Sequence, residues 1–191
     1  MSSKKLAITD GWNLFLDRDG VINVRIPGNY VSTWDDFTFI PGALEALALL
    51  DSLMGRILVV SNQQGIGKGV MTPGAVAAIH ARMIEEVQRR GGRIDAVYVS
   101  PNLEEEFSFS RKPNIGMALK ARKEFPEIRF PKSLIVGDSL SDMLFGRRIG
   151  MKTVFLSTHL PDIRKSHKLI DLAFPDLLSF AQYIHGIPVH S

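Results

Sequence analysis

The stretch LFLDRDGVIN, residues 14–23, decides the fold of this chain. An apolar run followed directly by charged residues predicts a buried strand over residues 13–17 that ends at Asp17. Asp19 follows two positions later, and Gly20 gives the backbone the freedom to turn. Two carboxylates at one strand end can bind a hard cation through oxygen, or divide the roles of nucleophile and general acid/base.

Two other interpretations of this acidic turn compete with a catalytic one. A calcium loop of the EF-hand type needs an oxygen ligand at its fifth position and Glu at its twelfth, but these positions hold Val21 and Gly28. The EF-hand interpretation is therefore excluded. A solvated turn stays open for an isolated DxDG, although its place after a strongly apolar strand favours a functional site.

Outward from this strand, short β-branched runs alternate with longer amphipathic stretches, which is the pattern of parallel strands joined by helices. The predicted strands cover residues 13–17, 56–61, 94–100, 134–137 and 153–156. The predicted helices cover residues 42–53, 73–90, 113–123, 139–149 and 176–184. Residues 20–41 show no clear period and are expected to leave the sheet as an irregular excursion. We therefore expect a single α/β domain over residues 1–191, a three-layer α/β/α Rossmann-like sandwich whose mostly parallel sheet carries the ligand site at its carboxyl edge.

Composition limits the class of protein. The chain has 191 residues, of which 45% are hydrophobic and 23% charged, and these are ordinary values for a globular domain. No apolar run approaches the roughly 20 residues that span a bilayer, so we expect no membrane partner. We also expect a cytoplasmic location and a monomeric state. The formal net charge of +3 comes from scattered basic residues rather than a stripe, which argues against nucleic-acid binding and suits a small anionic partner. The absence of cysteine excludes disulfides, thiolate nucleophiles and cysteine-bound zinc.

Three further polar motifs follow predicted strands. SNQQGIGKG, residues 61–69, lacks the spacing of a P-loop, which leaves Ser61 at a strand end with a hydroxyl and an N–H available to phosphate oxygens. RKP, residues 111–113, places two cations ahead of a predicted helix. LIVGDSLSDM, residues 134–143, puts Asp138 at a strand end and Asp142 in the first turn of the next helix, where a simple capping role is the alternative. Each motif has an ordinary structural explanation alone, but four motifs at successive strand ends predict one crevice.

Taken together, these motifs resemble those of the haloacid dehalogenase (HAD) superfamily of aspartate-nucleophile phosphatases. The match extends from residue 14 to residue 156. LDRDGVIN, FIPGALEAL, SNQQGIGKG, RKP and GDSLSDM also resemble the subfamily that holds D-glycero-D-manno-heptose 1,7-bisphosphate 7-phosphatase and histidinol-phosphate phosphatase. The resemblance implies a magnesium-dependent phosphomonoester hydrolase with a minimal cap. The expected partner is a small phosphorylated metabolite, and the first candidate is a heptose 1,7-bisphosphate that loses its 7-phosphate.

The resemblance also implies a role for each motif residue. Asp17 is the expected nucleophile, and Asp19 the general acid and then base. The expected cofactor is Mg²⁺, held by Asp17, Asp138 and the backbone carbonyl of Asp19. Ser61 and Lys112 are expected to hold the transferring phosphoryl oxygens. The expected supporting residue is Asp142, for Lys112 or a metal-bound water, and the candidate substrate-binding residues are Asn62, Lys68 and Arg111.

One loop departs from the subfamily. Its typical members carry a structural zinc on a Cys-x-His and a Cys-x-Cys ahead of RKP, whereas this chain has Ser100-Pro101-Asn102 and Ser108-Phe109-Ser110 at those places. Because Ser and Asn are not usual zinc ligands, we expect no structural zinc. The sequence instead predicts a loop ordered by packing of Leu103, Phe107 and Phe109.

Other functions remain open at this point. Histidinol-phosphate phosphatase, or a phosphatase for another small ester, is the main alternative within enzymes. A non-enzymatic receiver-like phosphoacceptor domain is more distant, because receivers lack an acid/base carboxylate two residues after the phosphoacceptor, the position of Asp19. A catalytically dead binding module conflicts with the presence of every motif residue.

Overall fold

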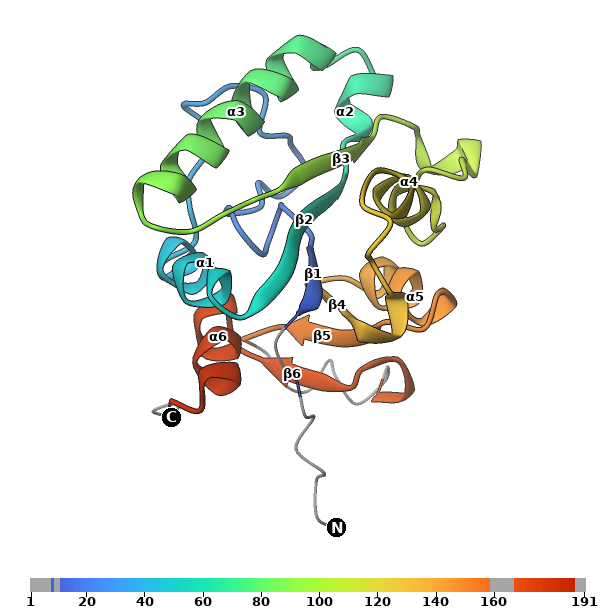
Figure 1. Ribbon diagram of the computed structural model, residues 1–191. Coiled ribbons are helices and arrows are strands. Elements are labelled where there is room, and N and C mark those ends of the chain that lie inside the picture. The colour runs from blue at the N-terminus through green and yellow to red at the C-terminus, as the bar shows by residue number, and fades with distance from the viewer. Residues whose placement is uncertain (1–7, 9–10, 159–166, 188–191) are drawn as a thin grey trace.

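The computed structural model describes residues 8, 11–158 and 167–187, and centres on a six-stranded parallel sheet of order β3-β2-β1-β4-β5-β6 (Figure 1). The strands are β1 Trp12–Leu16, β2 Met54–Asn62, β3 Ala96–Ser100, β4 Ser133–Gly137, β5 Lys152–Leu156 and β6 Leu172–Phe174. The first five match the predicted strands to within a few residues. β6 was not predicted, because it is three half-buried residues long and offers almost no periodicity to detect.

Strand β1 lies in the middle of the sheet and is buried along its whole length. Its side chains alternate between the two faces, as a strand must. Leu14 and Leu16 belong to the apolar cluster on one face, and Phe15 belongs to the cluster on the other. A central strand buried on both faces explains the continuous apolar run that precedes Asp17.

Helices cover both faces of the sheet, which confirms the predicted three-layer architecture (Figure 1). They are α1 Ala43–Asp51, α2 Gln64–Gly67, α3 Pro73–Arg89, α4 Gly116–Glu124, α5 Leu140–Arg148 and α6 Leu177–His185. α1, α3 and α6 pack on the face of Leu14, and α4 and α5 on the face of Phe15. Within the described ranges, none of these helices combines the length and the apolar character needed to cross a membrane.

Side chains cap the starts of two helices, α3 and α6. Thr72 Oγ1 accepts a hydrogen bond from Ala75 N at 3.1 Å, and the Asp176 carboxylate accepts one from Ser179 N at 2.7 Å. The start of α4 differs from the prediction: the helix begins at Gly116 rather than near Pro113. The turn before it is closed by a hydrogen bond from Gly116 N to the Phe109 carbonyl.

The segment between β1 and α1 is the expected irregular excursion. It carries an aromatic cluster in which the rings of Trp34 and Phe37 stack at 4.9 Å and Phe39 lies edge-on to both. The guanidinium of Arg82, on α3, lies 4.7 Å from the centre of the Trp34 ring. The cluster fixes the segment against the body of the protein and leaves residues 25–31 at the carboxyl edge of the sheet.

Candidate active site

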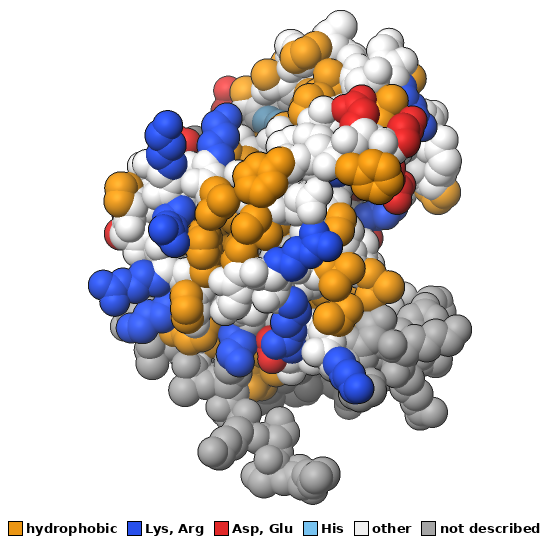
Figure 2. Space-filling view, turned by 90° about the vertical axis from the view of Figure 1, so that its right-hand side faces the viewer, with side chains coloured by type: hydrophobic (Ala, Val, Ile, Leu, Met, Phe, Trp, Pro, Cys, Tyr) orange, Lys and Arg blue, Asp and Glu red, His pale blue; other side chains and the backbone are white. Residues whose placement is uncertain are grey.

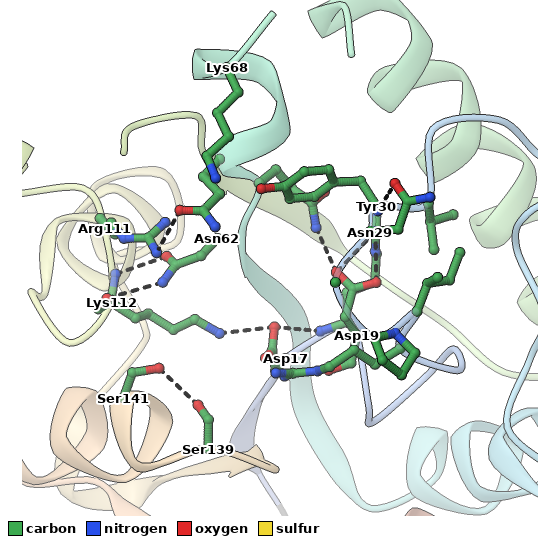
Figure 3. A pocket seen from close by; sticks show the side chains of 18 residues that line it. Asp17, Asp19, Asn29, Tyr30, Asn62, Lys68, Arg111, Lys112, Ser139 and Ser141 are labelled. Carbon is green, nitrogen blue, oxygen red and sulfur yellow. Dashed lines mark hydrogen bonds and ion pairs between the residues drawn. The ribbon is translucent and has the colours of Figure 1, made fainter. Parts of the chain in front are cut away.

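A cavity of about 490 Å³ opens at the carboxyl ends of the central strands (Figure 3). It is lined on one side by residues 25–31 and on the other by the strand ends and the loop before α4. The predicted site residues that line it are Asp17, Asp19, Asn62, Lys68, Arg111 and Lys112. The position agrees with the rule that parallel α/β sheets bind ligands beyond the carboxyl ends of their strands.

Asp17 lies directly after β1 and is buried. Its Oδ1 accepts a hydrogen bond from Arg18 N at 2.7 Å and lies 2.9 Å from Lys112 Nζ. Among the described residues no donor reaches its Oδ2, which is therefore the oxygen left for chemistry. Burial raises the pKa of Asp17 to about 7 although Lys112 opposes this, and the nearby carboxylates Asp142 and Asp138 add to the rise.

Lys112 bridges two carboxylates. Its Nζ lies 2.6 Å from Asp142 Oδ1 as well as 2.9 Å from Asp17 Oδ1, and all three side chains are nearly or fully buried. Burial alone would lower the pKa of Lys112, but Asp142 and Asp17 outweigh it and the pKa is raised. The buried ammonium group therefore stays charged beside the carboxylate of Asp17.

Asp142 supports this arrangement from the first turn of α5. Its Oδ2 accepts hydrogen bonds from Ser139 Oγ at 2.6 Å and Ser139 N at 3.2 Å, which completes a capping box. A Cβ on Gly137 would lie 2.3 Å from Asp142 Cβ, so only glycine fits beneath the side chain. Of the two supporting roles expected for Asp142, contact with Lys112 is the one that the geometry supports, and the capping role accompanies it.

Asn62 holds the backbone of Lys112. Its Oδ1 accepts from Lys112 N at 2.9 Å and its Nδ2 donates to Lys112 O at 3.0 Å, so the amide is engaged at both ends. Asn62 therefore positions Lys112 while also lining the cavity. Arg111 donates to the Asn102 carbonyl at 3.1 Å, and Lys68 reaches into the cavity from the end of α2 (Figure 3).

Asp19 is held by three side chains. Arg18 Nη2 donates to its two oxygens at 2.8 and 3.0 Å, Asn23 Nδ2 donates to Oδ1 at 2.9 Å, and Gln63 Nε2 donates to Oδ2 at 2.8 Å. Burial alone would raise the pKa of Asp19, but the charge of Arg18 and these hydrogen bonds outweigh it, and the pKa is lowered. Asp19 is thus an ionised carboxylate next to the nucleophile candidate.

Ser61, like Asp138 and Asp142, is a predicted site residue that lies outside the cavity lining. It is almost fully buried, and its Oγ accepts a hydrogen bond from Gln63 Nε2 at 2.7 Å. It is absent from the cavity lining, whereas its neighbours Asn62 and Gln63 are part of it. In this arrangement its hydroxyl orients Gln63, which in turn contacts Asp19.

The acidic residues form a corner that fits a hard cation. Carboxylate oxygens of Asp17, Asp138 and Asp142 lie within 4.8 Å of one another, and the donor set is entirely oxygen. Gly20 makes room for this corner, since a Cβ there would lie 2.0 Å from Asp138 Oδ2. Burial raises the pKa of Asp138 to about 6, against the opposing charge of Arg25. The carboxylate of Asp19 is engaged by the three side chains described above. The group of Asp19 that faces this corner is therefore its backbone carbonyl.

The loop before α4 is ordered in a different way from the prediction. Phe107 and Phe109 are 85% and 62% exposed, so the expectation that they order the loop by packing is wrong. The side chains at the four departing positions instead converge. Ser110 Oγ lies 3.0 Å from Ser100 Oγ, 3.1 Å from Ser108 Oγ and 2.9 Å from Asn102 Oδ1. This serine-asparagine cluster, residues 100, 102, 108 and 110, ties the two ends of the loop together with neutral hydrogen bonds.

Several residues around the site were not predicted: Arg18, Asn23, Arg25, Gln63 and His80. Arg18 is fully buried, and its Nη1 lies 3.0 Å from Nε2 of His80 on α3. Arg18 can only donate, so Nε2 accepts and Nδ1 carries the proton of the neutral ring. The one available signal was the position of His80 on the buried face of α3, beside Val76, Ile79 and Met83. A histidine in an apolar stripe needs a polar partner, but sequence does not say which.

Comparisons with known proteins show which family the chain resembles. The HAD-hydrolase-like family model matches residues 109–177. A D-glycero-alpha-D-manno-heptose-1,7-bisphosphate 7-phosphatase of Mycobacterium bovis is 35% identical over 170 residues, which cover 89% of this chain and 90% of that protein. A D-glycero-beta-D-manno-heptose-1,7-bisphosphate 7-phosphatase of Helicobacter pylori is 36% identical over 155 residues, which cover 81% of this chain and 87% of that protein.

Solved structures give the same result. The D,D-heptose 1,7-bisphosphate phosphatase of B. bronchiseptica, crystallised with magnesium and phosphate, superposes with a TM-score of 0.81 at 25% identity and covers 91% of this chain and 98% of its own. The corresponding enzyme of Burkholderia thailandensis has a TM-score of 0.64 at 29% identity, with the same coverage of 91% and 98%. With identity of this level along most of its length, and with a buried aspartate paired to a lysine at the head of the parallel sheet, this chain belongs to the HAD superfamily and is a phosphatase.

Proposed function

We propose that this phosphatase hydrolyses the 7-phosphate of a D-glycero-D-manno-heptose 1,7-bisphosphate with the help of Mg²⁺. The observation that carries the proposal is the buried pair of Asp17 and Lys112 at the base of a cavity lined by cationic side chains. The names of the relatives in Mycobacterium bovis and Helicobacter pylori support the substrate. A sugar with two phosphates also suits a cavity of about 490 Å³ that Lys68 and Arg111 line.

In the first step, Asp17 Oδ2 attacks the phosphorus and forms an aspartyl-phosphate, while the bond to the sugar oxygen breaks. Lys112 stabilises the charge on the transferring oxygens from its fixed place beside Asp17. Asp19 gives a proton to the leaving sugar oxygen. For this step Asp19 must be protonated, so one of its hydrogen bonds from Arg18 has to loosen.

In the second step, Asp19 takes a proton from water, and the resulting hydroxide attacks the phosphorus and releases inorganic phosphate from Asp17. Having given up its proton in the first step, Asp19 is ionised, and the ionised carboxylate is the form that accepts a proton. Gln63 and Asn23 hold the carboxylate in place from two sides.

Asp17, Asp138 and the Asp19 carbonyl are the groups that would hold Mg²⁺, and the solved relative with magnesium and phosphate supports this assignment. When bound there, a divalent cation supplies positive charge that offsets the repulsion between the Asp17 carboxylate and a phosphate dianion. We propose the roles of the site residues from this geometry and from that solved relative. The cytoplasmic location, the monomeric state and the absence of structural zinc stay predictions from the sequence.

The deciding experiment is phosphate release, with Mg²⁺, from both anomers of heptose 1,7-bisphosphate beside histidinol phosphate. We expect kcat/KM for at least one heptose anomer to exceed that for histidinol phosphate and for a generic aryl phosphate by at least about a hundredfold, since recognition of a second phosphate adds charged hydrogen bonds. A preference for histidinol phosphate would replace the substrate. Equal rates on the heptose bisphosphates, histidinol phosphate and the aryl phosphate would disprove the substrate assignment but not the phosphatase activity.

Asp17→Asn tests the nucleophile in the same assay. The change preserves shape but removes the attacking charge, so turnover should fall at least about ten-thousandfold while the circular dichroism spectrum is kept. The matched control is Asp36→Asn, which changes a carboxylate that hydrogen-bonds within the excursion at Ser32 and Thr33, away from the cavity lining. Activity of Asp17→Asn near that of the control would disprove the assignment.

A further inference from the structure

Arg25 reaches into the acidic corner of the site. Its Nη2 donates to Asp138 Oδ1 at 2.7 Å and to the backbone carbonyl of Asp19 at 3.1 Å. The side chain comes from the irregular excursion, is 51% exposed, and also lines the cavity. One nitrogen of a half-exposed side chain therefore lies where two of the proposed cation ligands converge.

A guanidinium nitrogen and a divalent cation cannot occupy the same place between these two oxygens. Mg²⁺ draws its oxygen ligands to about 2.0–2.1 Å in octahedral geometry, so a cation held by Asp138 Oδ1 and the Asp19 carbonyl would lie where Arg25 Nη2 lies now. Two positive charges in contact with the same two oxygens would also repel each other strongly.

The charge balance of the acidic corner explains why the positively charged side chain of Arg25 lies there. Asp17, Asp138 and Asp142 bring three carboxylates within 4.8 Å, and Lys112 contacts only the first and the last of them. Asp138 is the carboxylate that Lys112 does not pair, and Arg25 is its ion-pair partner. The guanidinium thus supplies the positive charge that the corner lacks.

We propose that Arg25 competes with the divalent cation for Asp138 and the Asp19 carbonyl, and that cation binding releases its side chain toward the cavity. The inference rests on the proposed metal-dependent function. Because the residue lines the cavity, its released charge would lie with Lys68 and Arg111 on the path of an anionic substrate. Binding of the cation would then also prepare the cavity for the phosphorylated sugar.

The test is a calorimetric titration of chelator-treated protein with Mg²⁺, which needs no turnover. The variants are Arg25→Ala, Arg25→Lys and, as a matched loss of one surface charge, Arg90→Ala at the exposed end of α3. Competition predicts that Arg25→Ala binds Mg²⁺ about three- to tenfold more tightly than wild type, the range expected for a partly exposed charged contact. Arg25→Lys should fall between the two, and Arg90→Ala should match wild type.

A second measurement follows the guanidinium itself. In ¹⁵N NMR spectra, the signal of the Arg25 Nε–H, assigned by its loss in Arg25→Ala, should change its chemical shift as Mg²⁺ is added, because the neighbouring Nη2 leaves Asp138. An unchanged signal at saturating Mg²⁺, or an Arg25→Ala variant that binds no more tightly than wild type, would overturn the competition alone. Failure of wild type and Arg25→Ala alike to bind Mg²⁺ would overturn the metal-dependent function and the competition with it.

Discussion

Lys112 shows how single residues set the chemistry of this site. A buried ammonium group is costly unless carboxylates surround it, and here Asp17 and Asp142 do so at 2.9 and 2.6 Å. Asn62 fixes the backbone of the lysine and Gly137 admits the side chain of Asp142. Three residues at strand ends and one in the first turn of α5 therefore cooperate to place one charge.

Asp142→Asn tests this cooperation. The amide keeps an oxygen for the Ser139 hydrogen bonds but removes the charge that faces Lys112. We expect a loss of about 1–3 kcal/mol in the free energy of unfolding, the range for a buried charged hydrogen bond, and a fall in kcat of at least about tenfold. Urea unfolding and steady-state kinetics measure the two effects. Glu85→Gln on the exposed side of α3 is the control, and equal behaviour of the two variants would contradict the role of Asp142.

His80 makes a prediction about pH. Burial, followed by the charge of Arg18, lowers its pKa from 6.5 to about 4, so the folded protein keeps the ring neutral while the unfolded chain takes up a proton near pH 6.5. The stabilisation is therefore complete above about pH 6.5 and is lost as the pH falls from there toward 4, up to about 3 kcal/mol. His80→Gln retains an acceptor for Arg18 and removes the titration. Its unfolding free energy should depend less steeply on pH between 6.5 and 4, and an unchanged slope would count against this assignment.

At the scale of elements, the loop from β3 to α4 is the clearest departure from expectation. Its aromatic side chains point to solvent, and the serine-asparagine cluster holds it. The sequence identified these four positions but not their mutual contacts, because the pairing of short polar side chains depends on the path of the backbone between them. A packing prediction from Phe107 and Phe109 failed for the same reason: hydrophobic character does not fix direction in a loop.

Ser110→Ala removes the hydroxyl that contacts three partners in the cluster. We expect faster hydrogen exchange over residues 101–111 and a loss of about 1 kcal/mol in stability. Ser52→Ala, which removes an exposed hydroxyl that donates to Leu49 at 3.2 Å, should change neither. Protection of the loop equal to wild type would show that the cluster does not hold it. Metal analysis of the same samples checks the predicted absence of stoichiometric zinc.

The sequence predicted those helices and strands that are long and show a clear hydrophobic period. Strands β1 to β5 and helices α1, α3, α5 and α6 were found, because apolar runs and capping residues mark them, and α4 was found with a start three residues too early. β6 and the four-residue α2 were missed, since neither is long enough to show a period. In the site, residues at strand ends were found from position alone. Arg18, Arg25 and His80 were not, because their partners lie far along the chain or across the cavity.

At the scale of the whole molecule, the sheet gathers acidic side chains at its carboxyl edge, where Asp17, Asp138 and Asp142 lie. On the face seen in Figure 2, Lys and Arg side chains lie scattered among apolar ones and do not form a continuous stripe. The acidic corner, by contrast, draws on residues from β1, β4 and α5 that only folding brings together. A cation that binds this corner only in the folded chain should therefore stabilise the fold.

Mg²⁺ should therefore raise the melting temperature as well as support activity. We expect chelation to reduce phosphate release by at least about a thousandfold and readdition of Mg²⁺ to restore it. We also expect 10 mM Mg²⁺ to raise Tm by several degrees, because the cation binds the folded chain alone. Differential scanning calorimetry of wild type and Asp138→Asn checks this, and the variant should lose the shift. Full activity in excess chelator would exclude a divalent cation from the mechanism.

The serine-asparagine cluster gives the region beside the active site an unusual chemical durability. Peroxide attacks thiolates and chelators withdraw metal ions, but hydroxyl and amide groups offer neither reagent a target. The hydrogen bonds among Ser100, Asn102, Ser108 and Ser110 form whenever the chain folds. They require neither the binding of a metal ion nor the oxidation of a thiol. Because the chain has no cysteine, the conformation of this loop does not depend on thiol oxidation.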